Sequence, residues 1–390
     1  MTSSFRSMFA VGLLLLLVLP HAVSAQSKPR ARDLGVPFEG NPGPVNAITD
    51  VPGVEVGYAT LIIGEPKQDT ASGTVRTGVT AIWPRGKENS TPVFGGWFTL
   101  NGNGEMTGTT WLEESGLLGG PVMITNTHSV GLVRDAVIAH QIKKWHLDTW
   151  SLPVVAETYD GRLNDVNGFH VKEEHVFEAL DKAHGGAIAE GNVGGGTGMT
   201  CHGFKGGTGT SSRKTEDGYT VGVLVQANHG NKRRLTIAGV PVGEEIGDRT
   251  SRIDSASDGT GSIIIVIGTD APLLPHQIKG LAKRASLGVG RVGGLGENSS
   301  GDIFVAFSTA NSNVGDTKNP TIQLTAVNSG RTLNRLYAAV VQSTEESIVN
   351  ALVAAETMTG AQGRKADTLP HDRLKEILKK YGRLIEAKGK

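Results

Sequence analysis

Short apolar runs rich in β-branched residues recur along this 390-residue chain, and each is bounded by Gly, Pro, Asn or Asp. Runs of this length and composition are typical of buried β-strands. They lie at 80–83, 93–98, 122–125, 154–156, 221–225, 263–267 and 303–307. Glycine is also frequent, at 54 residues, which is about twice its average share. Because the glycines are spread between the runs, they predict tight turns in a strand-rich protein.

Apolar residues at helical spacing predict helices from Ser129 onward, over 273–285 with Pro275 in its first turn, over 345–357 and over 371–384. Runs of strands with helices clustered at the ends favour an α+β layered fold over regular βαβ alternation. The sequence shows no internal repeat and no clear linker, so we expect one compact unit. The polar, Pro/Gly-rich segment 26–45 is predicted to form an extended arm.

The first 25 residues have the pattern of a secretory signal peptide. Arg6 supplies a positive charge, residues 9–19 are apolar, and the small residues Val23-Ser24-Ala25 form a cleavage box before Gln26. The apolar stretch is shorter than the ~20 residues that span a bilayer. We therefore expect residues 1–25 to be removed and the mature protein to be periplasmic or secreted, without a membrane anchor.

Charge and cysteine content exclude several classes of protein. Lys plus Arg and Asp plus Glu both number 38, so nothing in the charge balance indicates a nucleic-acid partner. Cys201 is the only cysteine, so no disulfide can form within the chain. A lone cysteine can be a nucleophile, but no companion motif supports that role for Cys201.

Several familiar motifs are matched only in part, or lack the neighbouring elements that their function requires. The G-x-G-x-x-G at 288–293 follows a helical segment rather than a strand, and the glycine-rich loop 191–198 lacks the P-loop lysine. The S-x-x-K at 211–214 falls in a predicted polar loop. His and Glu residues at 170–175 lack zinc-protease spacing and indicate a solvated helix start. There is no G-x-S-x-G elbow.

Gly261 and Ser262 form an unusual strand boundary. Ser262 opens the apolar run 263–267 and is entered through a glycine, which packing alone explains poorly. A chain cut before Ser262 would leave an α-amine beside the serine hydroxyl. An unperturbed α-amine has a pKa of about 7.7–8.0, so a useful fraction is neutral near pH 7 and can accept the hydroxyl proton. Most Gly-Ser pairs are only loop ends, and the pair by itself fits both interpretations.

Other polar residues stand where predicted strands begin or end. Ser300 and Asp302 precede the strand 303–307, Asn228 follows the strand 221–225, and Glu157 and Tyr159 follow 154–156. Strand ends in a layered fold can bring such side chains into one cleft. Ser-Gly-Asp and Asn-His-Gly are also ordinary turn sequences.

At these residues the chain resembles the L-aminopeptidase/D-esterase–amidase family of self-processing peptidases, which includes the β-peptidyl aminopeptidases. The resemblance covers essentially the whole mature chain, and the segment after Gly261 is the most specific part. It is carried by 46–57 (NAITDVPGVEVG), 77–84 (TGVTAIWP), 261–276 (GSIIIVIGTDAPLLPH), 299–311 (SSGDIFVAFSTAN) and 369–373 (LPHDR).

The resemblance implies a four-layer αββα sandwich, similar in architecture to Ntn hydrolases but differently connected. It also implies self-cleavage between Gly261 and Ser262, which yields a larger subunit, 26–261, and a smaller subunit, 262–390. The processed pairs would assemble into a homo-oligomer, and no metal or organic cofactor would be used.

The same resemblance assigns roles to individual residues. Ser262 matches the nucleophile, and Ser300 and Asp302 match a serine and an acid that help to activate and orient it. Asn228 matches the side-chain donor to the oxyanion. Glu157 and Tyr159 match residues near the amino group of the substrate and the tetrahedral intermediate.

The resulting prediction is an exported hydrolase that releases N-terminal amino acids from peptides, amides or esters through an acyl ester on Ser262. One alternative is an acyltransferase like the ornithine acetyltransferases, but those use a threonine nucleophile, so Ser262 argues against it. Another is a non-enzymatic exported ligand-binding protein, which would remain one intact chain. The preference for L-, D- or β-amino-acyl substrates stays open.

Overall fold

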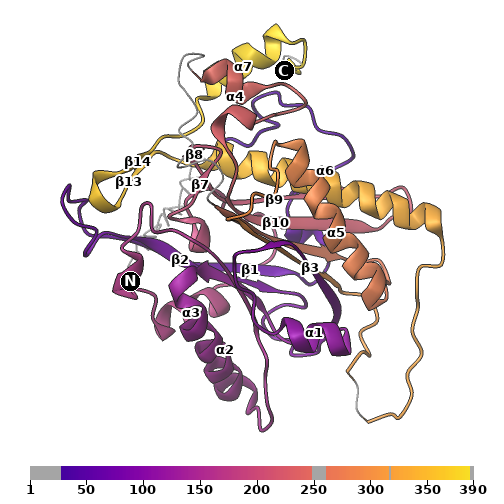
Figure 1. The fold of residues 1–390 in the computed structure, drawn as a ribbon. Helices are drawn as coiled ribbons and strands as arrows, with labels where there is room; N and C mark the ends of the chain where they lie inside the picture. The colour runs from indigo at the N-terminus through magenta and orange to yellow at the C-terminus, as the bar shows by residue number, and fades with distance from the viewer. Residues whose placement is uncertain (1–27, 248–260, 316–317, 387–390) are drawn as a thin grey trace, which may run out of the picture.

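Two β-sheets stack face to face in the structure, a computed structural model of the chain that describes residues 28–247, 261–315 and 318–386. Helices cover the outer face of each sheet, so the molecule has four layers (Figure 1). The predicted αββα sandwich is confirmed. Within the described residues, no helix is both long and apolar enough to cross a bilayer. The predicted signal peptide lies outside the described residues.

The larger sheet has six strands. Its neighbours pair antiparallel except for β12 and β11, which are parallel. In spatial order the strands are β4 (Leu117–Leu118), β3 (Val93–Gly102), β12 (Gly301–Ser308), β11 (Ser262–Thr269), β10 (Thr220–Asn228) and β9 (Gly207–Lys214).

The smaller sheet has four strands, and its last two are parallel. In spatial order they are β1 (Glu55–Ile63), β2 (Val75–Trp83), β5 (Val122–Asn126) and β6 (Val154–Thr158). Two small hairpins lie outside these sheets: β7 (Thr200–Cys201) with β8 (Phe204–Lys205), and β13 (Met358–Thr359) with β14 (Lys365–Ala366).

β11 is buried on both of its faces, which explains its unbroken β-branched sequence. Ile264 and Val266 pack between the two sheets, whereas Ile263, Ile265 and Ile267 pack toward the helices. β11 also lies between β10 and β12 in the sheet. The predicted smaller subunit therefore contributes two central strands to a sheet whose other strands come from the predicted larger subunit.

Helices α5 (Pro275–Arg291) and α6 (Gly330–Ala354) cover the six-stranded sheet, and α2 (Val130–Trp145) and α3 (Glu173–Asp181) cover the four-stranded sheet (Figure 1). Shorter helices are α1 (Thr109–Ser115), α4 (Val242–Ile246) and α7 (His371–Lys380). One-turn 3₁₀ helices lie at Ile48–Asp50, Thr127–Ser129, Val166–Gly168, Gly194–Gly196, Lys232–Arg234 and Ala361–Gly363. Pro275 occupies the first turn of α5, as predicted.

Several predicted segments differ in extent from the structure. The helices expected over 273–285 and 371–384 span Pro275–Arg291 and His371–Lys380. The helix expected over 345–357 begins at Gly330, where the Ser329 hydroxyl accepts a hydrogen bond from the Thr332 backbone amide, and it ends at Ala354. The arm expected to be extended contains a hydrogen-bonded turn, in which the Gly35 amide donates to the Arg32 carbonyl.

The predicted polar loop at 211–214 is also wrong, because these residues form the end of β9. Ser211, Ser212 and Arg213 are buried there, and only Lys214 is exposed. The Ser211 hydroxyl donates to the Ser343 carbonyl of α6 at 2.7 Å. The strand is polar because it packs against polar groups of α6 rather than against an apolar face.

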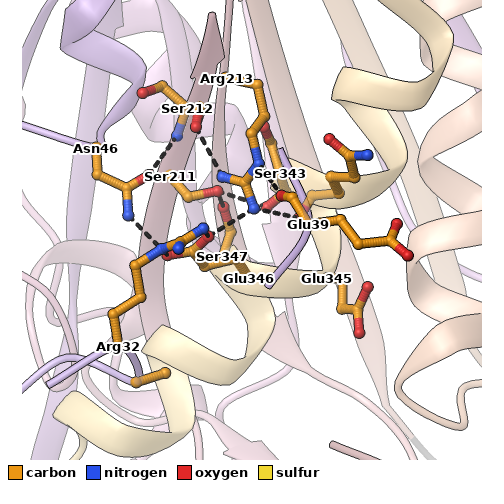
Figure 2. Close-up of polar contacts among 12 residues, drawn as sticks. Arg32, Glu39, Asn46, Ser211, Ser212, Arg213, Ser343, Glu345, Glu346 and Ser347 are labelled. Carbon is orange, nitrogen blue, oxygen red and sulfur yellow. Dashed lines mark hydrogen bonds and ion pairs between the residues drawn. The ribbon is translucent and has the colours of Figure 1, made fainter. Parts of the chain in front are cut away.

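Glu346 of α6 is the centre of a charged cluster, here called the Glu346 anchor, which also contains Arg32, Asn46 and Arg213 (Figure 2). Glu346, Asn46 and Arg213 are buried, and Arg32 is half-buried. Arg213 donates to Oε2 at 2.6 Å, Asn46 donates to Oε1 at 2.6 Å, and Arg32 contacts both oxygens at 2.7 and 2.8 Å. Burial raises the pKa of Glu346, but the two guanidinium groups outweigh it and hold that pKa below its usual value. The anchor ties the N-terminal segment and β9 to α6.

Candidate active site

Three neighbouring strands bring their ends together at Ser262. Ser262 is the first residue of β11 and pairs with Asn228, the last residue of β10. On its other side it pairs with Gly301, the first residue of β12. Because β11 and β12 are parallel, their starting residues lie level at the same edge of the sheet. The predicted candidates Asn228, Ser262 and Ser300–Asp302 therefore meet at one place.

Ser262 is buried, with 6% of its surface exposed, and its Oγ accepts a hydrogen bond from the Gly301 amide at 3.1 Å. Gly261 lies directly against the carbonyl of Asn228. A Cβ at position 261 would come within 2.1 Å of that oxygen, so only glycine fits here. The residue before the serine is thus held close to β10 by the absence of a side chain.

Asp302 orients a small hydrogen-bonded group beside Ser262. The Ser300 hydroxyl donates to Oδ1 at 2.6 Å, and the Asn101 amide donates to Oδ2 at 3.2 Å. The Asp302 backbone amide donates in turn to the Asn101 side chain at 2.6 Å. Burial raises the pKa of Asp302 above its usual value although Ser300 and Asn101 donate to the carboxylate. Asn101 was not predicted, because only the pairing of β3 with β12 brings it here.

The orientation of Asn228 is fixed by two backbone contacts. Its Oδ1 accepts from the Thr200 amide at 2.8 Å, and its Nδ2 donates to the Tyr159 carbonyl at 2.9 Å. The first contact requires an acceptor and the second a donor, so the amide cannot be flipped. An amide nitrogen has two hydrogens, and the Tyr159 carbonyl takes one of them.

Glu157, at the end of β6, is buried and hydrogen-bonded on both oxygens. Oε1 accepts from the Glu105 backbone amide at 3.0 Å, and Oε2 accepts from the Thr127 hydroxyl. Burial raises the pKa of Glu157, and these two donors only partly oppose that effect. Neither Glu105 nor Thr127 was predicted, because no sequence pattern links the loop of Glu105 or the one-turn helix of Thr127 to β6.

Gly104 connects Glu157 to the strand ends around Ser262. A Cβ on Gly104 would lie 3.0 Å from the Gly301 Cα and 3.2 Å from Glu157 Oε1. Gly301 is the residue whose amide binds the Ser262 hydroxyl. The Glu157 carboxylate and the serine hydroxyl therefore approach the same small region, and a glycine separates them.

Tyr159 enters the site through its main chain rather than its phenol. Its side chain is 52% exposed and lies over Gly161, where a Cβ would come within 2.2 Å of the phenol oxygen. The Tyr159 carbonyl is the group that contacts Asn228. The structure thus brings Tyr159 beside the other predicted residues without directing its hydroxyl at them.

The arrangement is suited to acyl transfer. It combines a buried serine hydroxyl, an oriented amide donor from Asn228 and two buried carboxyl groups, Asp302 and Glu157. The model for peptidase family S58 matches residues 46–366. The chain belongs to peptidase family S58.

The relatives of this S58 peptidase cover almost all of its length. The β-peptidyl aminopeptidase BapA of Sphingosinicella microcystinivorans is 57% identical over 387 residues, 95% of this chain and 97% of the relative. BapA of Sphingosinicella xenopeptidilytica is 48% identical over 386 residues, 95% of this chain and 96% of the relative.

Solved structures give the same result. The L-aminopeptidase D-Ala-esterase/amidase of Ochrobactrum anthropi, a prototype of the serine aminopeptidases with a variant Ntn-hydrolase fold, is 49% identical with a TM-score of 0.84. The comparison covers 92% of this chain and 100% of that one. A β-aminopeptidase of Burkholderia sp. is 48% identical with a TM-score of 0.82, covering 91% of this chain and 99% of that one. The S58 chain is therefore a serine aminopeptidase with an Ntn-hydrolase-like fold, and the acyltransferase and ligand-binding alternatives have no support.

Proposed function

We propose that this chain cleaves itself between Gly261 and Ser262, and that the new N-terminal serine then hydrolyses aminoacyl substrates. The observation that carries the proposal is the position of Ser262 at the very start of β11, level with Asn228 and Gly301. Cleavage there would free an α-amine at the edge of the sheet, beside the hydroxyl of the same residue. No other serine is needed to supply both groups.

Self-cleavage would begin when Ser262 Oγ attacks the Gly261 carbonyl carbon. Collapse of the tetrahedral intermediate breaks the peptide C–N bond, and the hydroxyl proton passes to the departing nitrogen. The product is an ester between Gly261 and Ser262 Oγ, which water hydrolyses to a free carboxylate and a free hydroxyl. The close approach of Gly261 to the Asn228 carbonyl supports this step, because it fixes the residue whose carbonyl is attacked.

In substrate hydrolysis, the α-amine of Ser262 would take the hydroxyl proton while Oγ attacks the substrate carbonyl. The second N–H of Asn228 would donate to the oxyanion, a contribution of typically 10²–10³ in rate. Ser300 already donates its own proton to Asp302, so its oxygen can accept a hydrogen bond from the Ser262 amine or hydroxyl. Collapse of the tetrahedral intermediate breaks the substrate C–N bond, and the Ser262 amine passes the proton to the departing nitrogen. Water then hydrolyses the acyl ester, and Ser262 Oγ regains its proton.

Glu157 would bind the ammonium group of the substrate. Its carboxylate is buried, faces Gly104 and retains lone pairs beyond the contacts with Glu105 and Thr127. A buried carboxylate makes a strong charge-assisted hydrogen bond with an ammonium group. This contact would restrict the enzyme to substrates with a free N-terminus.

We propose β-amino-acyl peptides and amides as the preferred substrates. The support is the high identity to two β-peptidyl aminopeptidases, 57% and 48%, over nearly the whole chain. L-α-amino-acyl amides and D-amino-acyl esters are the second candidate, because the L-aminopeptidase D-Ala-esterase/amidase is 49% identical. The two classes differ by one methylene between the amine and the carbonyl carbon, which shifts the ammonium relative to Glu157.

A denaturing gel with N-terminal sequencing tests self-cleavage. Two fragments are expected, the smaller beginning at Ser262. Ser262→Ala should remain one chain and lose aminopeptidase activity, whereas Ser286→Ala, at a half-buried serine of α5, should be cleaved and active. A wild-type protein that is active as a single uncut chain would refute the proposal.

Kinetics on β-alanyl and L-alanyl p-nitroanilide test the substrate class. One methylene is worth about 10–200-fold in an apolar pocket, so kcat/KM for the β-alanyl compound should be at least tenfold higher. A preference for the L-alanyl compound would establish the second candidate instead.

We also propose that the enzyme is exported to the periplasm or medium and assembles as a homo-oligomer of processed pairs. Support for export comes from residues 1–25, and support for assembly comes only from the family resemblance. Cell fractionation with N-terminal sequencing at Gln26 tests the first. Light scattering of the processed protein tests the second, and a mass equal to one processed pair would exclude it.

A further inference from the structure

Three metal-ligating side chains are buried together behind the Asn228 amide. They are Cys201 of the β7 strand, His202 beside it, and His229 directly after β10. One ligand atom from each lies within 4.8 Å of the other two, and the Cys201 sulfur is 3.8 Å from His229 Nδ1. All three residues are fully or almost fully buried. The mechanism proposed above uses none of them.

The tautomer of His202 leaves its Nε2 lone pair without a hydrogen-bond donor among the described residues. Its Nδ1 is 3.0 Å from the Asn231 carbonyl, which can only accept, so Nδ1 carries the hydrogen and Nε2 carries the lone pair. The Nε2 atoms of both His202 and His229 are buried and find no hydrogen-bond partner among the described residues. Buried polar atoms normally have partners, and a histidine whose other nitrogen donates to a backbone carbonyl is the usual arrangement of a metal ligand.

We propose that Cys201, His202 and His229 bind a thiophilic divalent cation, with Zn²⁺ as the best fit. Thiolate and imidazole are the ligands that zinc prefers. Tetrahedral zinc, with bonds of about 2.3 Å to sulfur and about 2.0–2.1 Å to nitrogen, holds its ligand atoms roughly 3.5 Å apart. The cluster is slightly wider, so binding requires one imidazole to move inward by about 1 Å. On binding, the Cys201 thiol releases its proton and the sulfur forms a bond to the metal.

The cation would hold together the two segments that orient Asn228. Cys201 follows Thr200, whose amide binds Asn228 Oδ1, and His229 follows Asn228 itself. The His202 amide also donates to the His229 carbonyl at 2.7 Å. A metal bonded to all three side chains would fix β7 against the end of β10 and thereby fix the Asn228 amide.

This site departs from the expectation of no metal drawn from the sequence. The histidines nearest to a metal motif in the sequence are His170 and His175, and their Nε2 and Nδ1 atoms instead bind Asp165 and the Lys172 amide. The Cys201 cluster forms no sequence motif, because His229 lies 28 positions from Cys201 and joins it only through the fold. The proposed cation positions the oxyanion donor and takes no part in acyl transfer.

Cobalt titration of the purified, processed enzyme tests the site after chelator treatment and dialysis. Because Cys201 is the only cysteine, a thiolate-to-Co²⁺ charge-transfer band in the near ultraviolet can report only on this residue. We expect one Co²⁺ per processed pair of subunits, displacement of the band by Zn²⁺, and a Tm that rises by a few degrees with saturating Zn²⁺. Absence of both the band and the Tm shift in the wild-type protein would overturn the proposal, and this result does not depend on any variant folding.

Variants locate the cation. Cys201→Ser should abolish the band, and His202→Gln should weaken Co²⁺ binding by at least about tenfold. The matched control is His184→Gln, at an exposed histidine that bridges to Val56 of β1, and this variant should bind Co²⁺ as the wild type does. Unchanged stoichiometric binding in both Cys201→Ser and His202→Gln would place the cation elsewhere and refute the assignment.

Discussion

The Glu346 anchor and the active site lie at opposite ends of β10 and use buried charge in opposite ways. Arg213 of the anchor pairs with Val221 near the start of β10, and Asn228 of the site is the last residue of that strand, about 23 Å from Val221. In the anchor, both oxygens of Glu346 bind cationic or amide donors and its pKa is low. In the site, burial raises the pKa of both Asp302 and Glu157.

This difference separates a cluster that fixes structure from one that can react. The anchor is complete without a ligand, because two guanidinium groups neutralise its carboxylate in place. Among the described residues, no guanidinium group contacts the Asp302 or Glu157 carboxylate, so each can still respond to a proton or to an ammonium group. Both clusters join residues from either side of position 261, but only the anchor does so through ion pairs.

Removing the anchor carboxylate should give the largest effect, on stability. Glu346→Ala leaves the buried Arg213 charge unpaired, which costs about 3–5 kcal/mol in free energy of unfolding. Urea denaturation measures it, and kcat of the folded fraction should be unchanged. The control is Glu345→Ala, whose partner Arg291 is 41% exposed and whose loss should cost about 1 kcal/mol or less. Equal losses in the two variants would contradict the distinction drawn here.

Removing the oxyanion donor should lower activity strongly and stability only slightly. Asn228→Ala should lower kcat by about 10²–10³, while the free energy of unfolding changes by less than it does in Glu346→Ala. Steady-state kinetics on a preferred p-nitroanilide measure the effect, and the exposed Asn89→Ala is the control. A change in KM alone would remove Asn228 from the role of oxyanion donor.

As the pH is lowered, the enzyme should lose activity before the ion pairs of the Glu346 anchor are lost. The pKa values of Asp302 and Glu157 are raised in the folded state, so they accept protons at a pH above the usual carboxyl range. There kcat/KM falls further, in addition to the fall that protonation of the Ser262 amine causes at higher pH. Because the folded state binds these protons more readily than the unfolded state, this protonation favours folding as the pH drops. The anchor's contribution is lost only as the pH falls through the lowered pKa of Glu346. A pH profile of kcat/KM, recorded with near-ultraviolet circular dichroism, should show reversible loss of activity in an intact fold; simultaneous loss of both signals would contradict this order.

The smallest effect is expected at Gly104. Its substitution by alanine places a methyl group 3.2 Å from Glu157 Oε1 and 3.0 Å from Gly301 Cα, so KM should rise about tenfold. Self-cleavage should still occur, because it needs no substrate ammonium. Gly102→Ala is the matched control, since a Cβ there meets nothing within 4 Å. If both variants bind substrate equally well, Glu157 does not face the substrate across Gly104.

The sequence predicted the central strands well because β11 and β12 are buried on both faces and so are continuously apolar. It failed for β9, whose residues are small and polar. The fold explains why: a Cβ on Gly209 would lie 2.0 Å from the Ser347 carbonyl, so α6 approaches this strand too closely for large side chains. Hydrophobic pattern cannot reveal a strand that is buried by close helix packing and hydrogen bonds.

The candidate site shows the same limit. Ser262, Asn228, Ser300 and Asp302 were recognisable because each stands at a strand end, and strand ends converge. Asn101, Thr127 and Thr200 were not, because their contacts depend on pairings between distant segments. The direction of the Tyr159 phenol is likewise set by the loop around Gly161, which the sequence does not specify.

The central place of β11 has a consequence for folding kinetics. On the proposed division after Gly261, this strand belongs to one chain while its neighbour β10 belongs to the other. Folding of the precursor is a first-order process, whereas refolding of the processed enzyme requires two chains to meet. Refolding should therefore speed up with protein concentration in the wild type and be independent of it in Ser262→Ala. Processing would thus slow the return to the native state after unfolding, because the two chains must first associate.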